Sequence, residues 1–374
     1  MINRIAFVTN QIKDCAPIDI ISQIIEYIRD KGFEPIVISL RPQSEKDVPA
    51  YFPKNVRCGS LNKSFLELEL HPMRVAKELY SCLYWHKIDI AHSHSYQADI
   101  ICSYLPKKIR TITTQHNIAE EDFCLGKGFL LGSWMAINLV ERLKEFDYIV
   151  GVSQTVTQYC LEKTKSKVPM QTIYNNVVLP NVSVRKDDES NRIVYCGSLN
   201  KRKDPLLLLN AFTQLLDERR ISDDCVLEIL GDGVLRKKVE RIASIYPNNI
   251  IVRGFVANPA NIMASCDVFV SCSRSEGLGL SLIESISMGL IPVCTKIPPF
   301  NEIIGDCDIV KKLQFEKGDI LSLKESIVRS LNIHKDSISD FVQSVRNKFL
   351  DGQMAARYLD VYTNMIKLKW IHFL

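Results

Sequence analysis

Short apolar runs alternate with longer stretches of mixed apolar and polar residues along most of the chain. In the first half, these runs have the length and composition of buried parallel strands, and they lie at 4–8, 35–38, 88–91, 110–113 and 148–151. Residues 18–30, between the first two runs, place apolar side chains at helical spacing and are followed by Lys31-Gly32, a common helix end. This alternation predicts a doubly wound α/β sheet.

The same alternation starts again after a polar stretch at residues 184–191, which we interpret as a linker. Further strand-like runs follow it, at 192–196, 226–230, 250–252 and 268–270. A chain of 374 residues is also too long for one hydrophobic core, because single cores stop growing at roughly 250–300 residues. We therefore expect two Rossmann-like domains, at 1–180 and 191–353, facing across a cleft in which ligands bind.

The stretch at 271–292 reads SCSRSEGLGLSLIESISMGLIP and follows the strand-like run at 268–270. Gly277 and Gly279 allow a sharp bend and a close approach of a ligand to the backbone. A helix that begins near Leu280 would turn its free N–H groups and positive end toward this loop, which suits a phosphate. Glu276 lies in the loop, and Glu284 projects from the early helix toward the same ligand. The alternative is an ordinary strand-loop-helix with two solvated glutamates.

The Glu-x7-Glu spacing, the glycine-rich loop after a strand and the Gly-x-x-Pro exit resemble the donor-binding signature of the retaining glycosyltransferases called GT4, which have the GT-B fold. The resemblance covers nearly the whole chain and is most specific at 193–304. It implies transfer of a hexose-type sugar from a nucleotide diphosphate donor, most often UDP, to a saccharide or lipid-linked acceptor in cell-surface polysaccharide or glycolipid synthesis. It also implies that the first domain binds the acceptor, that the second binds the donor, and that a helix at about 354–374 packs back on the first.

A basic loop at 197–205, GSLNKRKDP, follows one predicted strand of the second domain. Its cations could neutralise a diphosphate, with Lys203 as a point charge and Arg202 as a two-pronged donor; a solvated basic turn is the alternative. Members of the resembled family carry Gly-Arg-Leu…Lys-Gly here, and Lys203 matches the lysine. Ser198 stands at the arginine position, so Arg202 is the candidate for the missing charge. We expect both cations and the helix end near Leu280 to stabilise the departing diphosphate.

Two further segments resemble donor-binding elements of the family. Asp232, in the turn LGDGVL, would contact the donor nucleotide, although an aspartate in a tight turn also bonds to its own backbone. Phe255 and Val256 belong to the segment that holds the base in relatives. A dinucleotide fingerprint is not formed here, because Arg236 replaces its third glycine. The resemblance assigns Glu276 to the donor sugar and both glutamates to donor binding.

Histidines follow two predicted strands of the first domain, at the strand ends where open α/β sheets bind ligands. His116, in TTQHN, resembles the family's site histidine, which contacts the reacting sugar, and a structural histidine is the alternative. His92 and His94 are too close together, and lack the further ligands that a metal site requires. We expect no bound metal and no cofactor besides the donor substrate.

The composition of the chain restricts the partners that the protein is expected to bind and the compartment in which it is expected to function. The net charge of +4 is too small to indicate nucleic acid. The 12 cysteines form no Cys-x-x-Cys pair, which favours a reduced, cytoplasmic setting. The chain begins without a signal-peptide pattern and has no apolar run near 18 residues. Residues 126–134 form an apolar cluster beside a lysine; we expect helix packing through Leu143, with peripheral association at the inner face of a membrane as the alternative.

Two other functions are compatible with the predicted architecture. A nucleotide-sugar epimerase would isomerise the donor without an acceptor. A non-catalytic partner subunit would keep the fold after losing the chemistry, and Ser198 favours it, whereas Glu276, Lys203 and Glu284 together argue for activity.

Overall fold

The computed structural model describes residues 3–13, 15–43, 51–53, 55–179 and 191–371. The chain divides into two compact units, one of residues 1–124, 129–176 and 352–374, the other of residues 125–128 and 177–351. The predicted linker at 184–191 lies outside the described residues except for Asn191.

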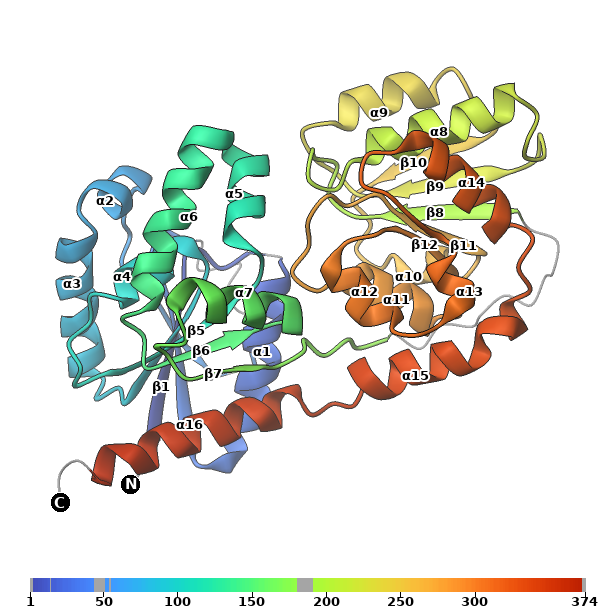
Figure 1. The fold of residues 1–374 in the computed structure, drawn as a ribbon. Coiled ribbons are helices and arrows are strands. Elements are labelled where there is room, and N and C mark those ends of the chain that lie inside the picture. Colours follow the sequence, from blue (N-terminus) through green and yellow to red (C-terminus); the bar gives the residue numbers. More distant parts are fainter. Residues whose placement is uncertain (1–2, 14, 44–50, 54, 180–190, 372–374) are drawn as a thin grey trace. The chain divides into compact units, whose positions relative to one another are not determined.

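The first unit is built on a seven-stranded parallel sheet with the strand order β3-β2-β1-β4-β5-β6-β7 (Figure 1). Its strands are β1 Asn3–Thr9, β2 Phe33–Ser39, β3 Arg57–Ser60, β4 Ile90–His94, β5 Arg110–Gln115, β6 Tyr148–Gly151 and β7 Met170–Thr172. The order reverses between β1 and β4, so the carboxyl ends of these two strands and of β5 lie at the switch point where open α/β sheets bind ligands.

Helices cover both faces of this sheet because the chain winds from β1 in two directions. In Figure 1, α1 and α16 lie together on one side, and α3, α4 and α6 lie on the other. The helices of this part of the chain are α1 Ala16–Ile28, the 3₁₀ turn η1 Arg29–Lys31, α2 Phe65–Leu70, α3 Pro72–Trp85, α4 Tyr96–Cys102, α5 Ala119–Lys127, α6 Phe129–Leu143, α7 Gln154–Thr164 and α16 Met354–Ile371. The helix predicted at 18–30 is α1 with η1, and Gly32 ends it at φ 84°.

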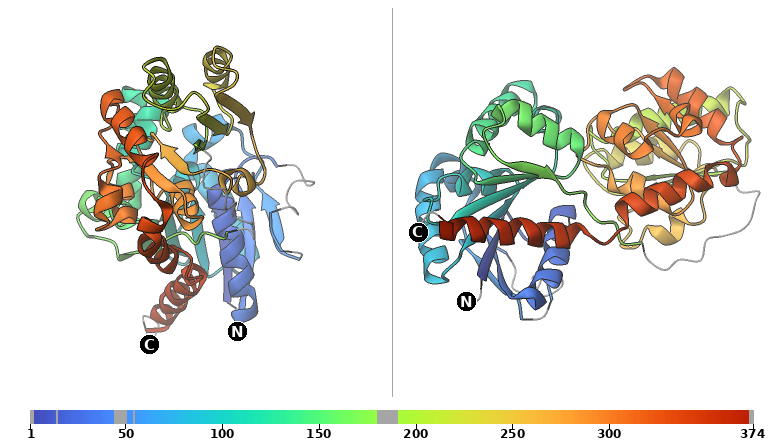
Figure 2. Two further views of the ribbon diagram at one scale, coloured as in Figure 1. Left: turned by 90° about the vertical axis from the view of Figure 1, so that its right-hand side faces the viewer. Right: turned by 60° about the horizontal axis from the view of Figure 1, so that its bottom comes forward.

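The C-terminal helix α16 is part of the core of the first unit. It packs against α1; Figure 2 draws α16 in dark red and α1 in blue. Tyr358 and Tyr362 are fully buried among the isoleucines of α1 and the side chains of β1 and β4. Burial of two aromatic side chains is worth several kcal/mol by area, of the order of 1.5–3 kcal/mol each. This contribution ties the last helix of the chain to the first.

The second unit repeats the architecture with a six-stranded parallel sheet in the order β10-β9-β8-β11-β12-β13. Its strands are β8 Arg192–Cys196, β9 Val226–Leu230, β10 Ile250–Gly254, β11 Val268–Ser271, β12 Ile291–Thr295 and β13 Gln314–Phe315. Its helices are α8 Pro205–Asp217, α9 Arg236–Ala243, α10 Ala260–Met263, α11 Leu280–Ser287, α12 Pro298–Ile304, α13 Asp308–Lys311, α14 Ile320–Ser330, the 3₁₀ turn η3 Lys335–Ile338 and α15 Ser339–Phe349. The two doubly wound sheets predicted from the sequence are confirmed.

The order of the second sheet reverses between β8 and β11, so their carboxyl ends also meet at a switch point. The loop after β8 is the predicted basic loop, and the loop after β11 is the predicted glycine-rich loop. Helix α11 begins at Leu280, as predicted, with Gly279 as its N-cap. The fold therefore brings the two loops that the sequence selected to one edge of one sheet.

Candidate functional site

The two loops of the second unit meet in a cluster of one carboxylate and two cations. The Nη1 atom of Arg202 donates to Oε2 of Glu276 at 3.0 Å, and Nζ of Lys203 forms an ion pair with the other carboxylate oxygen. Arg202 also donates to the carbonyl oxygen of Ser275 at 2.9 Å. One predicted sugar-binding carboxylate and both predicted diphosphate-binding cations are thus in direct contact.

Glu276 is ionised in this cluster although it is only 6% exposed. Burial opposes its charge, but the positive charges of Lys203 and Arg202 outweigh that effect, and the pKa of the Glu276 carboxyl lies below its ordinary value. The side chains of Arg202 and Lys203 remain 22% and 16% exposed. The two cations are therefore accessible from solvent, whereas the Glu276 carboxylate that neutralises them is buried.

The glycine-rich loop requires glycine at its last position. Gly279 has φ 104°, and a Cβ atom there would lie 2.5 Å from the ring of Phe300. With no side-chain cap on α11, the N–H groups of its first turn face the loop. Such a helix end attracts anions. Gly277 is buried beside it and Leu280 is half-buried.

Glu284 is half-buried on the second turn of α11. Its carboxylate lies close enough to Cys196, the last residue of β8, to affect that thiol. Burial, and to a smaller extent the charge of Glu284, raise the pKa of Cys196 to about 12, and Lys203 acts in the opposite direction. Glu284 and Lys203 are thus both near the carboxyl end of β8. This places Glu276, Glu284 and Lys203 around one strand end.

The remaining predicted donor-binding residues lie on neighbouring loops. Ser198 is exposed on the basic loop, next to Leu199, whose N–H donates to the carbonyl oxygen of Asp232 at 2.8 Å. The Asp232 carboxylate accepts from the N–H of Gly233 at 2.6 Å and from Arg236 at 2.7 Å, which is the local arrangement named as the alternative for this residue. Phe255 follows β10 and is 68% exposed, with Val256 half-buried beside it.

In the first unit, the carboxyl ends of β4 and β5 carry a histidine pair, of which His94 is fully buried and His116 is half-buried. The Nδ1 atom of His94 is 3.0 Å from Nε2 of His116, and their ring centroids are 5.3 Å apart. Burial lowers the pKa of His116 to about 4 and that of His94 well below its ordinary value, so both rings are neutral at physiological pH. Because Nε2 of His116 faces His94, only Nδ1 is left for a substrate.

A second set of hydrogen bonds ties this strand end to α16. His92 lies between Tyr362 and Thr114, at 2.8 Å from each hydroxyl, and Thr114 contacts the hydroxyl of Tyr358 at 2.9 Å. Burial lowers the pKa of His92 to about 3. The two tyrosines were not predicted from the sequence, since nothing near them in the chain marks a site. His92 is a structural residue that anchors α16.

Another buried group that the sequence analysis missed is Asp99, at the start of α4. Its carboxylate accepts hydrogen bonds from Ser93 at 2.6 Å, Thr113 at 2.7 Å and Gln115 at 3.1 Å. Burial raises the pKa of Asp99 to about 6 despite these donors. The carboxyl group lies inside the sheet-helix layer and is 2% exposed, so it has a structural role.

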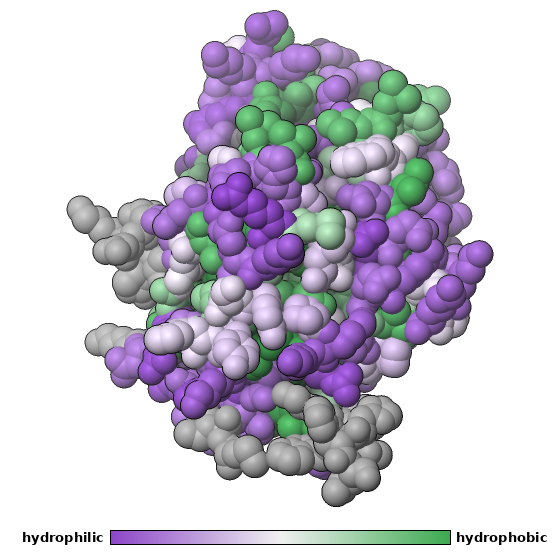
Figure 3. All heavy atoms as spheres, turned by 90° about the vertical axis from the view of Figure 1, so that its left-hand side faces the viewer, coloured by the Kyte–Doolittle hydropathy of each residue, from purple (hydrophilic) through white to green (hydrophobic). Residues whose placement is uncertain are grey.

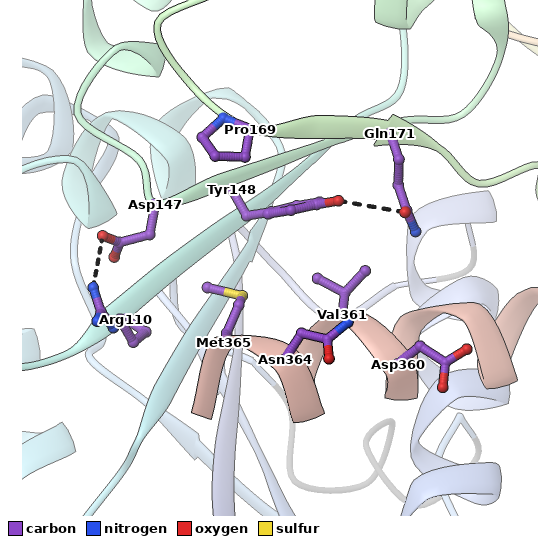
Figure 4. A pocket seen from close by; sticks show the side chains of 9 residues that line it. All are labelled: Arg110, Asp147, Tyr148, Pro169, Gln171, Asp360, Val361, Asn364 and Met365. Carbon is purple, nitrogen blue, oxygen red and sulfur yellow. Dashed lines mark hydrogen bonds and ion pairs between the residues drawn. The ribbon is translucent and has the colours of Figure 1, made fainter. Parts of the chain in front are cut away.

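The first unit also contains a pocket of about 260 Å³ away from the predicted site (Figure 4). It lies where β5 and β6 begin, whereas the histidines lie where β4 and β5 end. The polar side chains on its strand side are paired with one another: Arg110 contacts Asp147 at 3.4 Å, and Tyr148 donates to Gln171 at 3.3 Å. No candidate site residue lines this pocket.

The described residues include no group of three or more His, Cys, Asp or Glu side chains that could hold a metal ion. No helix in the described part of the chain has the length and apolar character needed to cross a bilayer. The core packing predicted at 126–134 is wrong for Phe129, Leu130 and Trp134, which are 77%, 84% and 54% exposed. The opposite face of α6 does pack into the core, and its buried residues are Gly132, Ala136, Leu139, Val140 and Leu143.

Two family descriptions match this chain in succession. The one called Glycosyltransferase Family 4 matches residues 20–179, and the one called Glycosyl transferases group 1 matches residues 181–344, which contain the Glu276, Glu284 and Lys203 constellation. The chain belongs to glycosyltransferase family 4. The recognition made from the Glu-x7-Glu motif is confirmed, and the protein is a glycosyltransferase.

Full-length relatives and solved structures agree with this membership. The O-antigen biosynthesis glycosyltransferase WclY of Escherichia coli is 25% identical over 97% of this glycosyltransferase and 99% of its own length. A UDP-Gal:alpha-D-GlcNAc-diphosphoundecaprenol alpha-1,3-galactosyltransferase of E. coli is 23% identical over 79% of this chain and 80% of its own. The structure of Anabaena HepE in complex with UDP and glucose covers 97% of this chain and 100% of HepE, with a TM-score of 0.76 and 15% identity. The GT-B fold prediction is confirmed.

Proposed function

We propose that this glycosyltransferase moves a hexose-type sugar from a UDP-sugar to a saccharide or lipid-linked saccharide, with retention at the anomeric carbon and without a metal ion. The observation that carries this proposal is the contact of Arg202 and Lys203 with Glu276 at the edge of the second sheet. Two accessible cations beside the open end of α11 have the charge and the geometry that a diphosphate requires.

The proposed roles follow the positions of the side chains around this strand end. Lys203 and Arg202 bind the diphosphate and stabilise the charge that develops as it departs, together with the N–H groups at the start of α11. Glu284, near the end of β8, accepts hydrogen bonds from the ribose hydroxyls. Glu276 is released from its cations when the diphosphate binds them and contacts the hydroxyls of the donor sugar.

The residues on the flanking loops complete the donor site in this proposal. Phe255 offers an exposed ring for the nucleotide base, and Val256 lies beside it. Asp232 and Ser198 border the same edge, with Asp232 held in place by Arg236. His116, from the first unit, contacts the reacting sugar through Nδ1 as a neutral group.

The names of relatives support UDP as the nucleotide and a polysaccharide as the product. One relative is named for a UDP-Gal donor and a diphosphoundecaprenol acceptor, another for O-antigen biosynthesis, and HepE has been solved with UDP and glucose. We therefore place this enzyme in cell-surface polysaccharide or glycolipid synthesis, at the cytoplasmic face of the membrane.

A lipid-linked acceptor is supported by the exposed apolar residues of α6. Figure 3 shows one face of the first unit, where apolar areas lie among hydrophilic ones. Leu130 and Trp134 have the chemistry of residues that rest in a bilayer interface. Replacing both by serine should reduce cosedimentation with anionic vesicles and activity on a lipid-linked acceptor, and should leave activity on a free saccharide unchanged. Equal vesicle binding by the variant would remove this support.

A donor screen tests the proposed function. The purified protein is incubated with UDP-hexoses and other nucleotide sugars, with and without free and lipid-linked saccharides, and the released nucleotide is measured. We expect acceptor-dependent release of UDP that persists in a chelator. Isomerised sugar without an acceptor would instead identify an epimerase, and no turnover with any pair would favour the non-catalytic subunit.

A further inference from the structure

A further ion pair between the two donor loops has no part in the proposed chemistry. The guanidinium of Arg274 contacts a single carboxylate oxygen of Asp204, from Nε at 2.8 Å and from Nη2 at 2.7 Å. Asp204 ends the basic loop directly after Arg202 and Lys203, and Arg274 lies two residues before Glu276. The pair therefore joins the two loops that carry the cations and the carboxylate of the candidate site.

The backbone at Asp204 adopts a conformation that is uncommon for residues other than glycine. Asp204 has φ 46° and ψ 52°, the left-handed conformation that glycine adopts without cost and that side chains with a Cβ adopt only at a cost. An aspartate at the N-cap of a helix normally accepts a hydrogen bond from the first turn, but the Asp204 side chain makes no such bond to α8. The residue forgoes both its favoured conformation and its cap, and its carboxylate bonds to Arg274 instead.

The other connections between the two loops are of two kinds. Arg202 and Lys203 reach Glu276, and Arg202 also reaches the carbonyl oxygen of Ser275. In the proposed function, the contacts with Glu276 are exchanged when the cations bind a diphosphate. The N–H of Arg274 donates to the carbonyl oxygen of Arg202 at 2.7 Å, and this backbone bond uses none of the side-chain donors that a diphosphate would occupy. The pair of Asp204 with Arg274 includes neither of the two proposed diphosphate-binding cations, so binding of the anion by Arg202 and Lys203 does not require it to break.

We infer that Asp204 and Arg274 form a latch that holds the basic loop against the glycine-rich loop while Arg202 and Lys203 exchange Glu276 for the donor diphosphate. Both are positioning residues, since neither is required to contact the donor. The inference rests on the proposed diphosphate role of the two cations. The Asp204 side chain is 13% exposed and that of Arg274 is 45% exposed, so the pair is partly shielded from solvent and contributes more than a surface pair would.

The Asp204→Gly variant separates the latch from simple electrostatics. Glycine accepts the left-handed conformation, so the backbone is not strained by the change. The variant also removes a negative charge near the site, which on charge alone would strengthen binding of an anion. If the pair acts as a latch, the variant should instead bind the anion more weakly. We expect Asp204→Gly and Arg274→Gln each to raise the dissociation constant of UDP about 3- to 10-fold, measured by calorimetry.

The double variant and a matched pair complete this experiment. Because both residues serve one contact, the double variant should bind UDP no more weakly than Arg274→Gln alone. Arg220→Gln and Glu325→Gln remove another ion pair of the same unit, with an N–O distance of 2.8 Å, and should leave UDP binding unchanged. Unchanged or tighter binding by Asp204→Gly, or additive losses in the double variant, would overturn the latch.

Hydrogen exchange tests the latch without any nucleotide. Peptides covering residues 198–206 should exchange faster in Asp204→Gly and Arg274→Gln than in the wild type, and at the wild-type rate in the two control variants. Equal exchange in all five proteins would overturn the inference. Failure of the wild type to bind UDP, with faster exchange in the two latch variants, would count against the proposed donor and leave the latch standing.

Discussion

Replacing Glu276 by glutamine should strengthen nucleotide diphosphate binding while it slows sugar transfer. In the free protein, the Glu276 carboxylate holds both Arg202 and Lys203, so a diphosphate has to compete with it for the same cations. Glutamine keeps the shape of the side chain and one acceptor oxygen but removes the charge. The free form then holds its cations less strongly, and the diphosphate gains the difference.

The size of this gain follows from the two contacts. A hydrogen bond to a charged group contributes about 1.5–3 kcal/mol. The cations are partly exposed and glutamine still accepts a hydrogen bond, so only part of this is recovered. We expect a gain of about 1–2 kcal/mol, which is about a 5- to 30-fold lower dissociation constant for UDP. Transfer should fall, because a contact to the donor sugar in the transition state is lost.

Calorimetry with UDP on the wild type and Glu276→Gln measures the first effect, and initial rates of transfer measure the second. Glu316→Gln is the control for long-range charge, because it removes one carboxylate from an exposed ion pair with Lys296 in the same unit. UDP binding by Glu276→Gln that is equal to or weaker than that of the wild type would refute the competition between the carboxylate and the diphosphate.

Three other predictions follow from the site and from the core of the first unit. Lys203→Ala should lower kcat/KM by about 10- to 150-fold through loss of a charge-assisted contact of about 1.5–3 kcal/mol, and an unchanged kcat/KM would reject its phosphate role. Because the pKa of His116 is lowered to about 4, the ring stays neutral above about pH 5, and transfer should show no His116-dependent acid limb between pH 6 and 8; a limb near pH 6.5 that is absent in His116→Gln would contradict this. Burial raises the pKa of Asp99 to about 6, so between about pH 4 and 6 the native state holds a proton that the unfolded state has released. The contribution of Asp99 to stability therefore decreases as the pH rises from about 4 to 6. The three tryptophans lie in the first unit, so urea unfolding followed by tryptophan fluorescence reports on that unit. As the pH rises from about 4 to 6, the free energy of unfolding of Asp99→Asn should increase relative to that of the wild type by up to about 3 kcal/mol; a pH-independent difference would refute the assignment.

Local patterns in the sequence were sufficient for the architecture and for the loop geometry. Apolar runs of strand length and the helical spacing after β1 predicted the parallel sheets, because each depends on residues close in the chain. Gly279 and the start of α11 at Leu280 were predictable for the same reason. The edge strands β3, β7 and β13 were not predicted, since segments of four, three and two residues carry too little periodicity.

Contacts between distant residues were beyond the reach of the sequence. Glu276 and Lys203 were each selected from a local motif, yet their ion pair joins positions 73 residues apart and emerges only from the strand order. The contacts of Tyr358 and Tyr362 with Thr114 and His92 span 244 and 270 residues. The pairing of His94 with His116 depends on the register of β4 and β5, which places both strand ends side by side.

The most direct test of the proposed mechanism is the stereochemistry of transfer by the purified enzyme. The donor and acceptor that give the highest UDP release are followed by proton NMR from the first minutes of reaction, with Lys203→Ala in parallel. We predict a product with the same anomeric configuration as the donor sugar, formed by the wild type in the presence of a chelator and formed far more slowly by the variant. A product of opposite configuration, or transfer that Lys203→Ala performs at the wild-type rate, would contradict the account.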